Sequence, residues 1–193
     1  MLSPGTSIAS LLRRYLELVA GLAPHYAPQA VAPTVATGAD DATLAHLAGA
    51  VGRPIPPQVA ELYRTADGVA SFDLFGVDLH SIATISRTHA ADSAWLRRNI
   101  DEVVDDTEDA ELAELMKDRA LVLAGSASHR ADLILFLLPP DPHAEWQITQ
   151  LVNGRWWEVT ENSYPDVASW LAALVGGREA DPAWGRTDRR PGA

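Results

Sequence analysis

The stretch ALVLAGSASHRADLILFLLPP, residues 120–140, decides the fold, because the hydrophobic pattern changes there from helical spacing to short apolar runs. Residues 121–123 and 133–138 form two such runs, bounded by glycine, serine or proline. Short apolar runs between turn residues are typical of strands buried in a sheet. We therefore expect these two segments to be paired inner strands.

The chain that follows continues the strand pattern and then returns to helical spacing. Residues 146–152 and 155–159 flank Asn153-Gly154, a dipeptide that tolerates positive backbone torsions and favours a two-residue hairpin. An amphipathic helix is expected over residues 164–175, and Gly176-Gly177 is expected to end it. The hairpin indicates an antiparallel sheet.

Toward the N-terminus, apolar residues recur mostly at helical spacing. A helix capped by Thr6 or Ser7 is expected to run to about Gly21 and to dock on the core. Residues 23–38 contain three prolines among small residues, so we expect an extended connector there. Between the connector and the inner strands, the pattern predicts a helix over residues 40–52, a helix from Pro57 to Gly68, short strands over 69–77 and 79–82, and a helix within 82–100.

Together these elements predict a single α+β domain, with an antiparallel sheet of four to six strands and helices packed mainly on one side. The length of 193 residues, 47% hydrophobic and 21% charged, is typical of a soluble folded chain. The absence of cysteine excludes disulfides, thiol nucleophiles and thiolate metal sites. No apolar stretch is long enough for a secretory signal or a membrane span, so we expect a cytoplasmic protein that does not bind membranes.

The order of elements and two short motifs resemble the SUKH superfamily, of the Smi/Knr type. The sequence VGRPIP at residues 51–56 matches the Leu-Gly-x-x-Leu-Pro elbow of that family, and Asp67-Gly68 matches the Asn-Gly or Asp-Gly that ends its next helix. Trp170 is a partial match to an aromatic pair near the start of the terminal helix. The resemblance spans residues 38–176, which leaves an N-terminal helix and Pro/Ala connector at 1–37 and a flexible C-terminal tail at 177–193.

This resemblance implies a binding scaffold. Many bacterial members of the family are immunity proteins that neutralise toxins, often nucleases, of polymorphic toxin systems, and fungal relatives regulate cell-wall assembly. The family has no shared catalytic motif, so the resemblance implies no catalytic residue, no enzymatic activity and no cofactor.

The net charge of −11 disfavours binding to nucleic acid and favours a basic protein partner. Eight of the 26 acidic residues lie between positions 101 and 114. One interpretation is a solvated face, which is what charge runs usually are. The other is a docking surface for a basic toxin domain. The candidate contact residues are Asp101, Glu102, Asp105, Asp106, Glu108 and Asp109.

Tryptophans offer a second candidate contact, although most tryptophans in strands and helices belong to the core. Trp156 and Trp157 are adjacent in an expected strand, so only one of them can face the core. Trp156, which follows Arg155, is the candidate for the exposed one and for a partner contact.

Two catalytic or metal hypotheses have weaker support. His80, His89 and Asp92 are the best metal candidates, but no two histidines lie one helical turn apart. Ser126 or Ser128 with His129 would supply a nucleophile and a base, but the nucleophile elbow lacks its second glycine. We therefore expect a noncatalytic immunity protein, with a regulatory adaptor of the cell-wall-assembly or stress type as the alternative and an unrecognised metal-dependent hydrolase as the third possibility.

Overall fold

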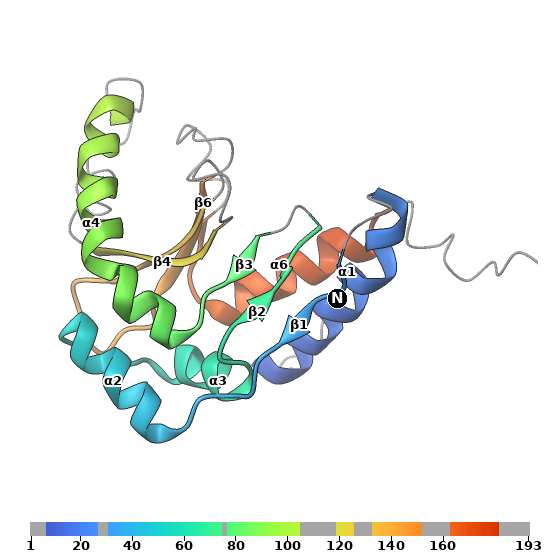
Figure 1. Ribbon diagram of the computed structural model, residues 1–193, viewed down its shortest axis with the longest axis horizontal. Coiled ribbons are helices and arrows are strands. Elements are labelled where there is room, and N and C mark those ends of the chain that lie inside the picture. Colours follow the sequence, from blue (N-terminus) through green and yellow to red (C-terminus); the bar gives the residue numbers. More distant parts are fainter. Residues whose placement is uncertain are drawn as a thin grey trace, which may run out of the picture.

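The computed structural model covers residues 1–193 and describes residues 7–26, 31–74, 77–104, 119–125, 133–151 and 163–181. Within these ranges the chain forms five helices and seven strands, arranged as shown in Figure 1. The helices are α1 (Ile8–Tyr26), α2 (Asp41–Val51), α3 (Pro57–Thr65), α4 (Ile82–Val104) and α6 (Val167–Glu179). The strands are β1 (Thr34–Val35), β2 (Val69–Ala70), β3 (Asp78–Leu79), β4 (Ala120–Gly125), β5 (Leu133–Leu137), β6 (Gln147–Leu151) and β7 (Ser163–Tyr164).

All seven strands form one antiparallel sheet in sequence order, so the α+β class and the antiparallel sheet are confirmed. The two runs within residues 120–140 are its central strands β4 and β5, as expected. The sheet has one strand more than the expected maximum of six. Four of the seven strands contain only two residues, which is too short for an alternating pattern to be recognised in a sequence.

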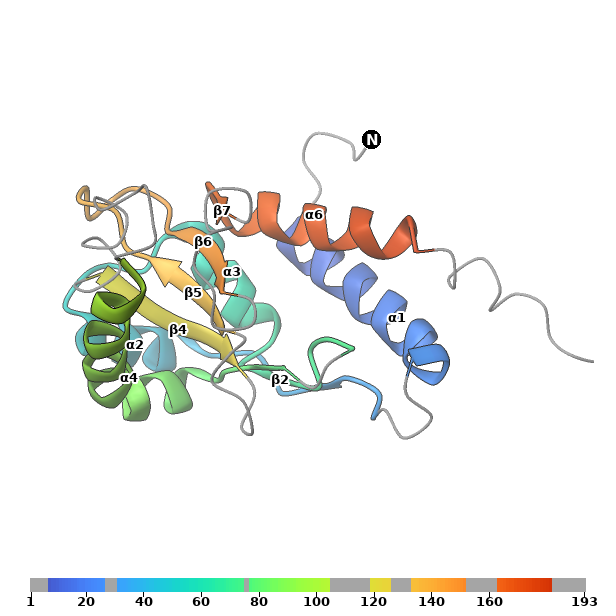
Figure 2. The ribbon, with the colours of Figure 1, turned by 90° about the horizontal axis from the view of Figure 1, so that it is seen from above.

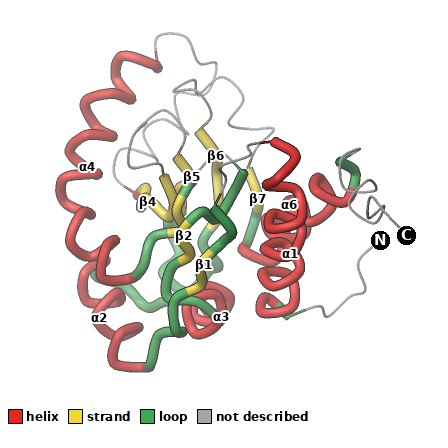
Figure 3. The backbone as a smooth tube through the Cα atoms, turned by 45° about the vertical axis from the view of Figure 1, so that its right-hand side comes forward, coloured by secondary structure: helices red, strands yellow, loops and turns green. Residues whose placement is uncertain are grey.

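Register separates the two faces of the sheet. Leu121 pairs with Phe136, and Phe136 pairs with Ile148, so these three side chains share one face. Val122 pairs with Leu135, and both lie on the opposite face. Helices α1, α3 and α6 pack together as a layer on the first face, whereas α4 lies along β4 on the second (Figures 2 and 3). The larger helical layer, formed by α1, α3 and α6, is therefore on the first face of the sheet.

Aromatic packing holds α1 and α6 on the first face. The ring centroids of Tyr15 and Phe72 are 4.9 Å apart, and those of Phe72 and Trp170 are 5.6 Å apart in a stacked arrangement. All three side chains are fully buried. The expected docking of the first helix on the core is confirmed, because α1 contributes eight buried residues and packs along α6.

Three helices run further than the sequence indicated, and one of them is α4, which continues to Val104 instead of ending within residues 82–100. Pro24 lies inside α1, so residues 23–26 are helical and are not part of an extended connector. Gly176 and Gly177 lie inside α6, which continues to Glu179 instead of ending at the glycines. Tertiary packing of α1 and α6 outweighs the low helix propensity of proline and glycine. At these ends Arg14 Nη2 lies 2.9 Å from Glu179 Oε1, and the Tyr26 hydroxyl donates to Asp181 Oδ2 over 2.6 Å.

The elbow between α2 and α3 has the expected geometry. Asp40 caps α2 by accepting a hydrogen bond from the Thr43 N–H at 2.8 Å, and Gly52 ends the helix with φ +69°, a left-handed conformation that suits glycine. Pro57 occupies the first turn of α3. Arg53 Nη1 donates to the Pro139 carbonyl at 2.8 Å and ties the elbow to the segment after β5.

The segment between α3 and α4 has less strand than expected. Among the described residues of 69–77 only Val69–Ala70 form a strand, and Ser71 then turns the chain with φ +54°. The second short strand is β3, and Ile82 already belongs to α4. The second arm of the expected hairpin, residues 155–159, lies outside the described residues. None of the helices in the described ranges has the length and apolar character needed to cross a membrane.

Candidate functional site

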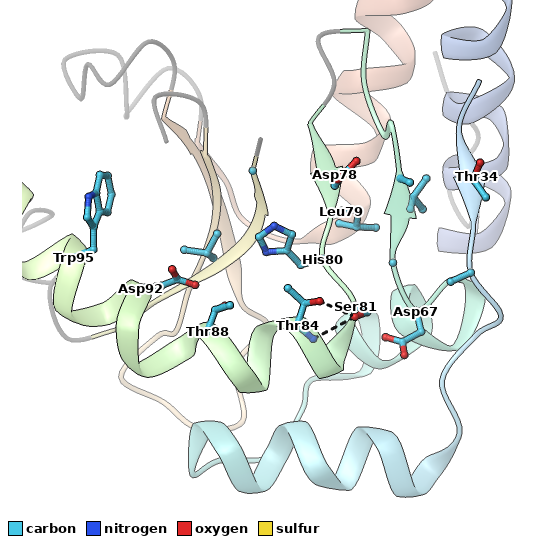
Figure 4. Close-up of a pocket in the computed structure, with 16 residues that line it drawn as sticks. Thr34, Asp67, Asp78, Leu79, His80, Ser81, Thr84, Thr88, Asp92 and Trp95 are labelled. Atoms are coloured by element: carbon cyan, nitrogen blue, oxygen red, sulfur yellow. Dashed lines mark hydrogen bonds between the residues drawn. The ribbon is translucent and has the colours of Figure 1, made fainter. Parts of the chain in front are cut away.

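A pocket of about 630 Å³ lies between α4 and the face of the sheet formed by strands β2 to β4 (Figure 4). Its volume is in the range of small-ligand sites, which is about 300–1,000 Å³. Polar side chains from both walls converge on it. The lining residues with polar or aromatic side chains are Thr34, Asp67, Asp78, His80, Ser81, Thr84, Thr88, Asp92 and Trp95.

One wall of the pocket is a stripe along α4. Thr84, Thr88, Asp92 and Trp95 are spaced by four, four and three residues, so they share one face of the helix. Ser81 caps this helix, because its hydroxyl accepts from the Thr84 N–H at 3.2 Å. The buried Leu96 lies beside the stripe and anchors α4. The sequence thus places three polar groups and one indole in a row along the pocket.

The opposite wall is held by two aspartates that stabilise the backbone. Asp67 Oδ1 accepts a hydrogen bond from the Ile82 N–H at 2.7 Å, and Asp78 Oδ1 accepts from the Ser71 N–H at 2.7 Å. Gly68, with φ +100°, brings the chain so close to the start of α4 that a Cβ there would lie 3.0 Å from the Ser81 nitrogen. These contacts fix the strands against the first turn of α4.

His80 follows β3 and lies across the pocket from Asp92 (Figure 4). Its N–H donates to the Leu123 carbonyl at 2.9 Å, which positions the residue beside β4. Burial lowers the pKa of the imidazole below its ordinary value of 6.5, although Asp92, Asp78 and a backbone hydrogen bond to Val122 oppose this shift. The ring is therefore neutral at pH 7. A neutral imidazole keeps one nitrogen as a hydrogen-bond acceptor.

Two polar atoms of the pocket wall are buried without a partner. His80 Nδ1 and Thr88 Oγ1 make no hydrogen bond with any described residue. Buried polar groups in folded proteins are nearly always hydrogen-bonded, and an ordered water molecule in a polar site commonly supplies the partner that such atoms need. The inner wall is therefore polar as well as concave.

The pocket also carries charge of one sign. Three carboxylates line it, from Asp67, Asp78 and Asp92, and no lysine or arginine is among the described residues that do so. Arg87 approaches from outside, with its Nη2 3.5 Å from Thr84 Oγ1, but it lines a separate depression between α2 and α4. The arrangement favours a ligand that is positively charged and rich in hydrogen-bond donors.

Most of the contact residues expected from the sequence lie outside the described residues. The backbone of Asp101 and Glu102 belongs to the last turn of α4, while Asp105, Asp106, Glu108, Asp109 and Trp156 lie outside the described residues. Ser126, Ser128 and His129 also lie outside them. The expectation of a docking surface at these positions therefore stays a prediction.

The structure brings together two of the three residues that the sequence suggested as metal ligands. His80 and Asp92 line the same pocket, but His89 does not, and its Nδ1 lies 3.4 Å from Ser93 Oγ. Among the described residues, no three His, Asp or Glu side chains come together as metal ligands. The tryptophans divide as well: Trp146 and Trp170 are fully buried, whereas Trp95 is half-buried and lines the pocket.

Thr84 and Thr88 line this site although the sequence did not single them out. The sequence does contain one signal for them. Thr84, Thr88, Asp92 and Trp95 recur at helical spacing, so they share one face of the helix. Asp67 and Asp78 gave no such signal, because the turns that bring them to the pocket are visible only in three dimensions.

Neither a scan of protein-family models nor a search of curated proteins finds a match to this chain. The resemblance to the SUKH superfamily therefore stays an expectation from the sequence, based on the motifs in residues 51–56 and 67–68, the partial match at Trp170 and the expected order of the elements.

Proposed function

We propose that this chain is a noncatalytic, cytoplasmic binding module for a basic protein, and more specifically an immunity protein that neutralises a toxin of a polymorphic toxin system. The observation that carries the proposal is the pocket beside α4, which is lined by three carboxylates and by no lysine or arginine among the described residues. A cationic surface is the natural complement of such a wall.

Two further observations support the proposal. The net charge of −11 raises the rate at which a basic partner is attracted, and many toxic nucleases carry basic surfaces because they bind nucleic acid. The two short motifs that carry the resemblance also support the proposal, and in each the glycine, at positions 52 and 68, has a positive φ. The regulatory-adaptor alternative shares the binding module but assigns it an endogenous partner.

The direct test is protection by coexpression. A toxin encoded next to this gene is expressed alone and together with this chain in the same host, and cell survival is measured. We expect survival only with both proteins, and a stoichiometric complex on size-exclusion chromatography. Cell death despite coexpression contradicts immunity. A complex with an endogenous protein instead of a toxin favours the adaptor, and metal-dependent turnover of a substrate panel favours a hydrolase.

A fourfold variant tests the acidic segment separately. Replacing Asp101, Asp105, Asp106 and Asp109 by Asn removes four charges, so association with the toxin should slow down while dissociation changes little. The same variant should reduce the salt dependence of association, because charges are screened over about 8 Å at physiological ionic strength.

The matched control removes four exposed charges from other surfaces, with Glu17, Asp141 and Glu179 replaced by Gln or Asn together with Asp41→Asn. An association rate that falls equally in both variants shows a general effect of net charge. An unchanged rate in the first variant means that residues 101–109 are only a solvated surface.

A further inference from the structure

We infer that the pocket between α4 and strands β2 to β4 receives a positively charged side chain, in particular an arginine, of the protein partner. The inference deepens the proposed function and rests on it, because it names the group by which a basic partner is recognised.

The sign of the ligand's charge follows from the wall. The residues that line the pocket offer hydrogen-bond acceptors, namely carboxylate oxygens and threonine and serine hydroxyls. An anion would find no cationic donor among the described lining residues. A guanidinium group supplies five N–H donors and one positive charge, which complements such a wall.

Asp92 is the carboxylate best placed to hold that charge. Asp67 and Asp78 each use one oxygen on a backbone N–H, whereas Asp92 forms no hydrogen bond or ion pair with another described residue. Asp92 is half-buried and faces His80 across the pocket (Figure 4). A bidentate pair between this carboxylate and a guanidinium group is stronger and more directional than a contact with an ammonium group.

Trp95 favours arginine over other cations. It lines the pocket one helical turn beyond Asp92, and a guanidinium plane packs well on an indole face. A metal ion is the other cation that carboxylates bind, but the described side chains bring no three ligands together for one. The pocket volume of about 630 Å³ is sufficient for a long side chain.

The position of the pocket on α4 indicates that the cation belongs to a protein. Asp92 and Asp101 are nine residues apart on the same helix, which corresponds to about 14 Å along its axis. The acidic segment of residues 101–114 therefore begins within one protein footprint of the pocket. A basic protein can contact both Asp92 and the end of α4 at Asp101, whereas a small cationic molecule in the pocket cannot span about 14 Å.

The test uses probes and needs no toxin. The ¹⁵N-labelled full chain is titrated with acetyl-Gly-Arg-Gly-amide, and with the same peptide carrying citrulline, which has the shape of arginine without the charge. We expect saturable shifts at backbone amides that line the pocket, such as Thr84 and Thr88, and at least about tenfold weaker binding of the citrulline peptide. No saturable shift with the arginine peptide, or equal affinity for both peptides, overturns the inference.

Variants identify the group responsible. Asp92→Asn should weaken the arginine peptide about tenfold, and Trp95→Leu should weaken it several-fold. The control is Glu17→Gln, which removes one exposed charge from α1 and should leave the affinity unchanged. If both pocket variants bind the arginine peptide as tightly as the wild type, the assignment of the pocket to an arginine is overturned. If Asp92→Asn perturbs the spectrum of the free chain, Trp95→Leu still provides the test.

A final experiment distinguishes an arginine side chain of a protein partner from a free small molecule that carries a guanidinium group. Propylguanidine should bind no tighter than the peptide, and binding about tenfold tighter overturns the assignment to a partner's side chain. A toxin that fails to bind while the arginine peptide binds contradicts the proposed function alone. A toxin that binds Asp92→Asn and wild type equally contradicts the pocket's role alone.

Discussion

The two faces of the sheet are built from different chemistry. On one face, α1 and α6 bury a continuous aromatic and aliphatic core around Tyr15, Phe72 and Trp170. On the other face, α4 is anchored by Leu96 but presents Thr84, Thr88 and Asp92 to the sheet, and a pocket remains. A helix that turns hydroxyls and a carboxylate toward a sheet gives up burial of apolar area, and with it stability. The first face therefore holds most of the buried apolar core, whereas the second face leaves an acidic pocket beside α4.

The strongest test of this comparison exchanges one tryptophan on each face for alanine. Trp170→Ala removes a fully buried ring that stacks on Phe72, so it should lower the free energy of unfolding by about 3–5 kcal/mol. Trp95→Ala removes a half-buried ring at the pocket and should cost less than about 1 kcal/mol. Urea unfolding measures both, and equal losses would break the distinction between the faces.

Two glycines sharpen the comparison at the pocket wall. Gly52 and Gly68 both have positive φ, but a Cβ at position 52 meets open space, whereas one at position 68 would lie 3.0 Å from the Ser81 nitrogen and 3.2 Å from the Leu79 carbonyl. Gly52→Ala should cost about 1–2 kcal/mol for backbone strain alone. Gly68→Ala should cost more, because it also displaces the start of α4. The prediction is wrong if urea unfolding shows the two variants to be equally stable.

Truncation tests how far the packed face extends. Removing residues 182–193 should leave the melting temperature unchanged, because the described contacts of α6 end at Asp181. Removing residues 178–193 also deletes the exposed partners of Arg14 and Tyr26, which should lower the melting temperature by about 2–4 °C. Sequence analysis placed the tail from residue 177 onward, and the structure moves its start beyond the end of α6. Equal melting temperatures for the two truncations would contradict this correction.

The smallest expected effect is a pH dependence at the pocket. The pKa of His80 is lower in the folded chain than its unfolded value near 6.5, so the unfolded state binds more protons and stability falls as the pH drops below about 6.5. His80→Gln removes this contribution. The difference in urea midpoint between wild type and variant should therefore change between pH 7 and pH 5, with the wild type losing more. A constant difference would show that His80 does not titrate with folding.

The parts that the sequence predicted well are those with a local physical signal. Asp40, Gly52 and Pro57 act through caps and fixed torsions, and they gave both ends of α2 and the start of α3 correctly, whereas α3 ends at Thr65, before the expected Gly68. The apolar runs of β4 and β5 were recognised because both faces of these strands are buried. Nonlocal effects were not visible. Helix α1 continues through Pro24 because its end packs against α6, and two-residue strands exist only through their partners.

The same division applies to the candidate site. His80 and Asp92 were selected as a metal pair from residue type, and the structure does bring them to one pocket, without a third ligand among the described residues. Thr88 and Trp95 join them only because α4 presents its polar stripe to the sheet. Predicting the site from the sequence would require knowing which face of α4 the sheet covers. The covering strands are β2 and β3, which precede α4, and β4, which begins 25 residues after Trp95.

Hydrogen–deuterium exchange of the toxin complex tests most directly whether the α4 face is the binding face. Backbone amides of residues 78–95 and of α1 and α6 are compared between the free chain and the complex. If the proposed partner binds at the pocket, we predict slower exchange at residues 78–95 in the complex, with α1 and α6 unchanged. Slower exchange confined to the exposed surfaces of α1 and α6, with residues 78–95 unchanged, would contradict it.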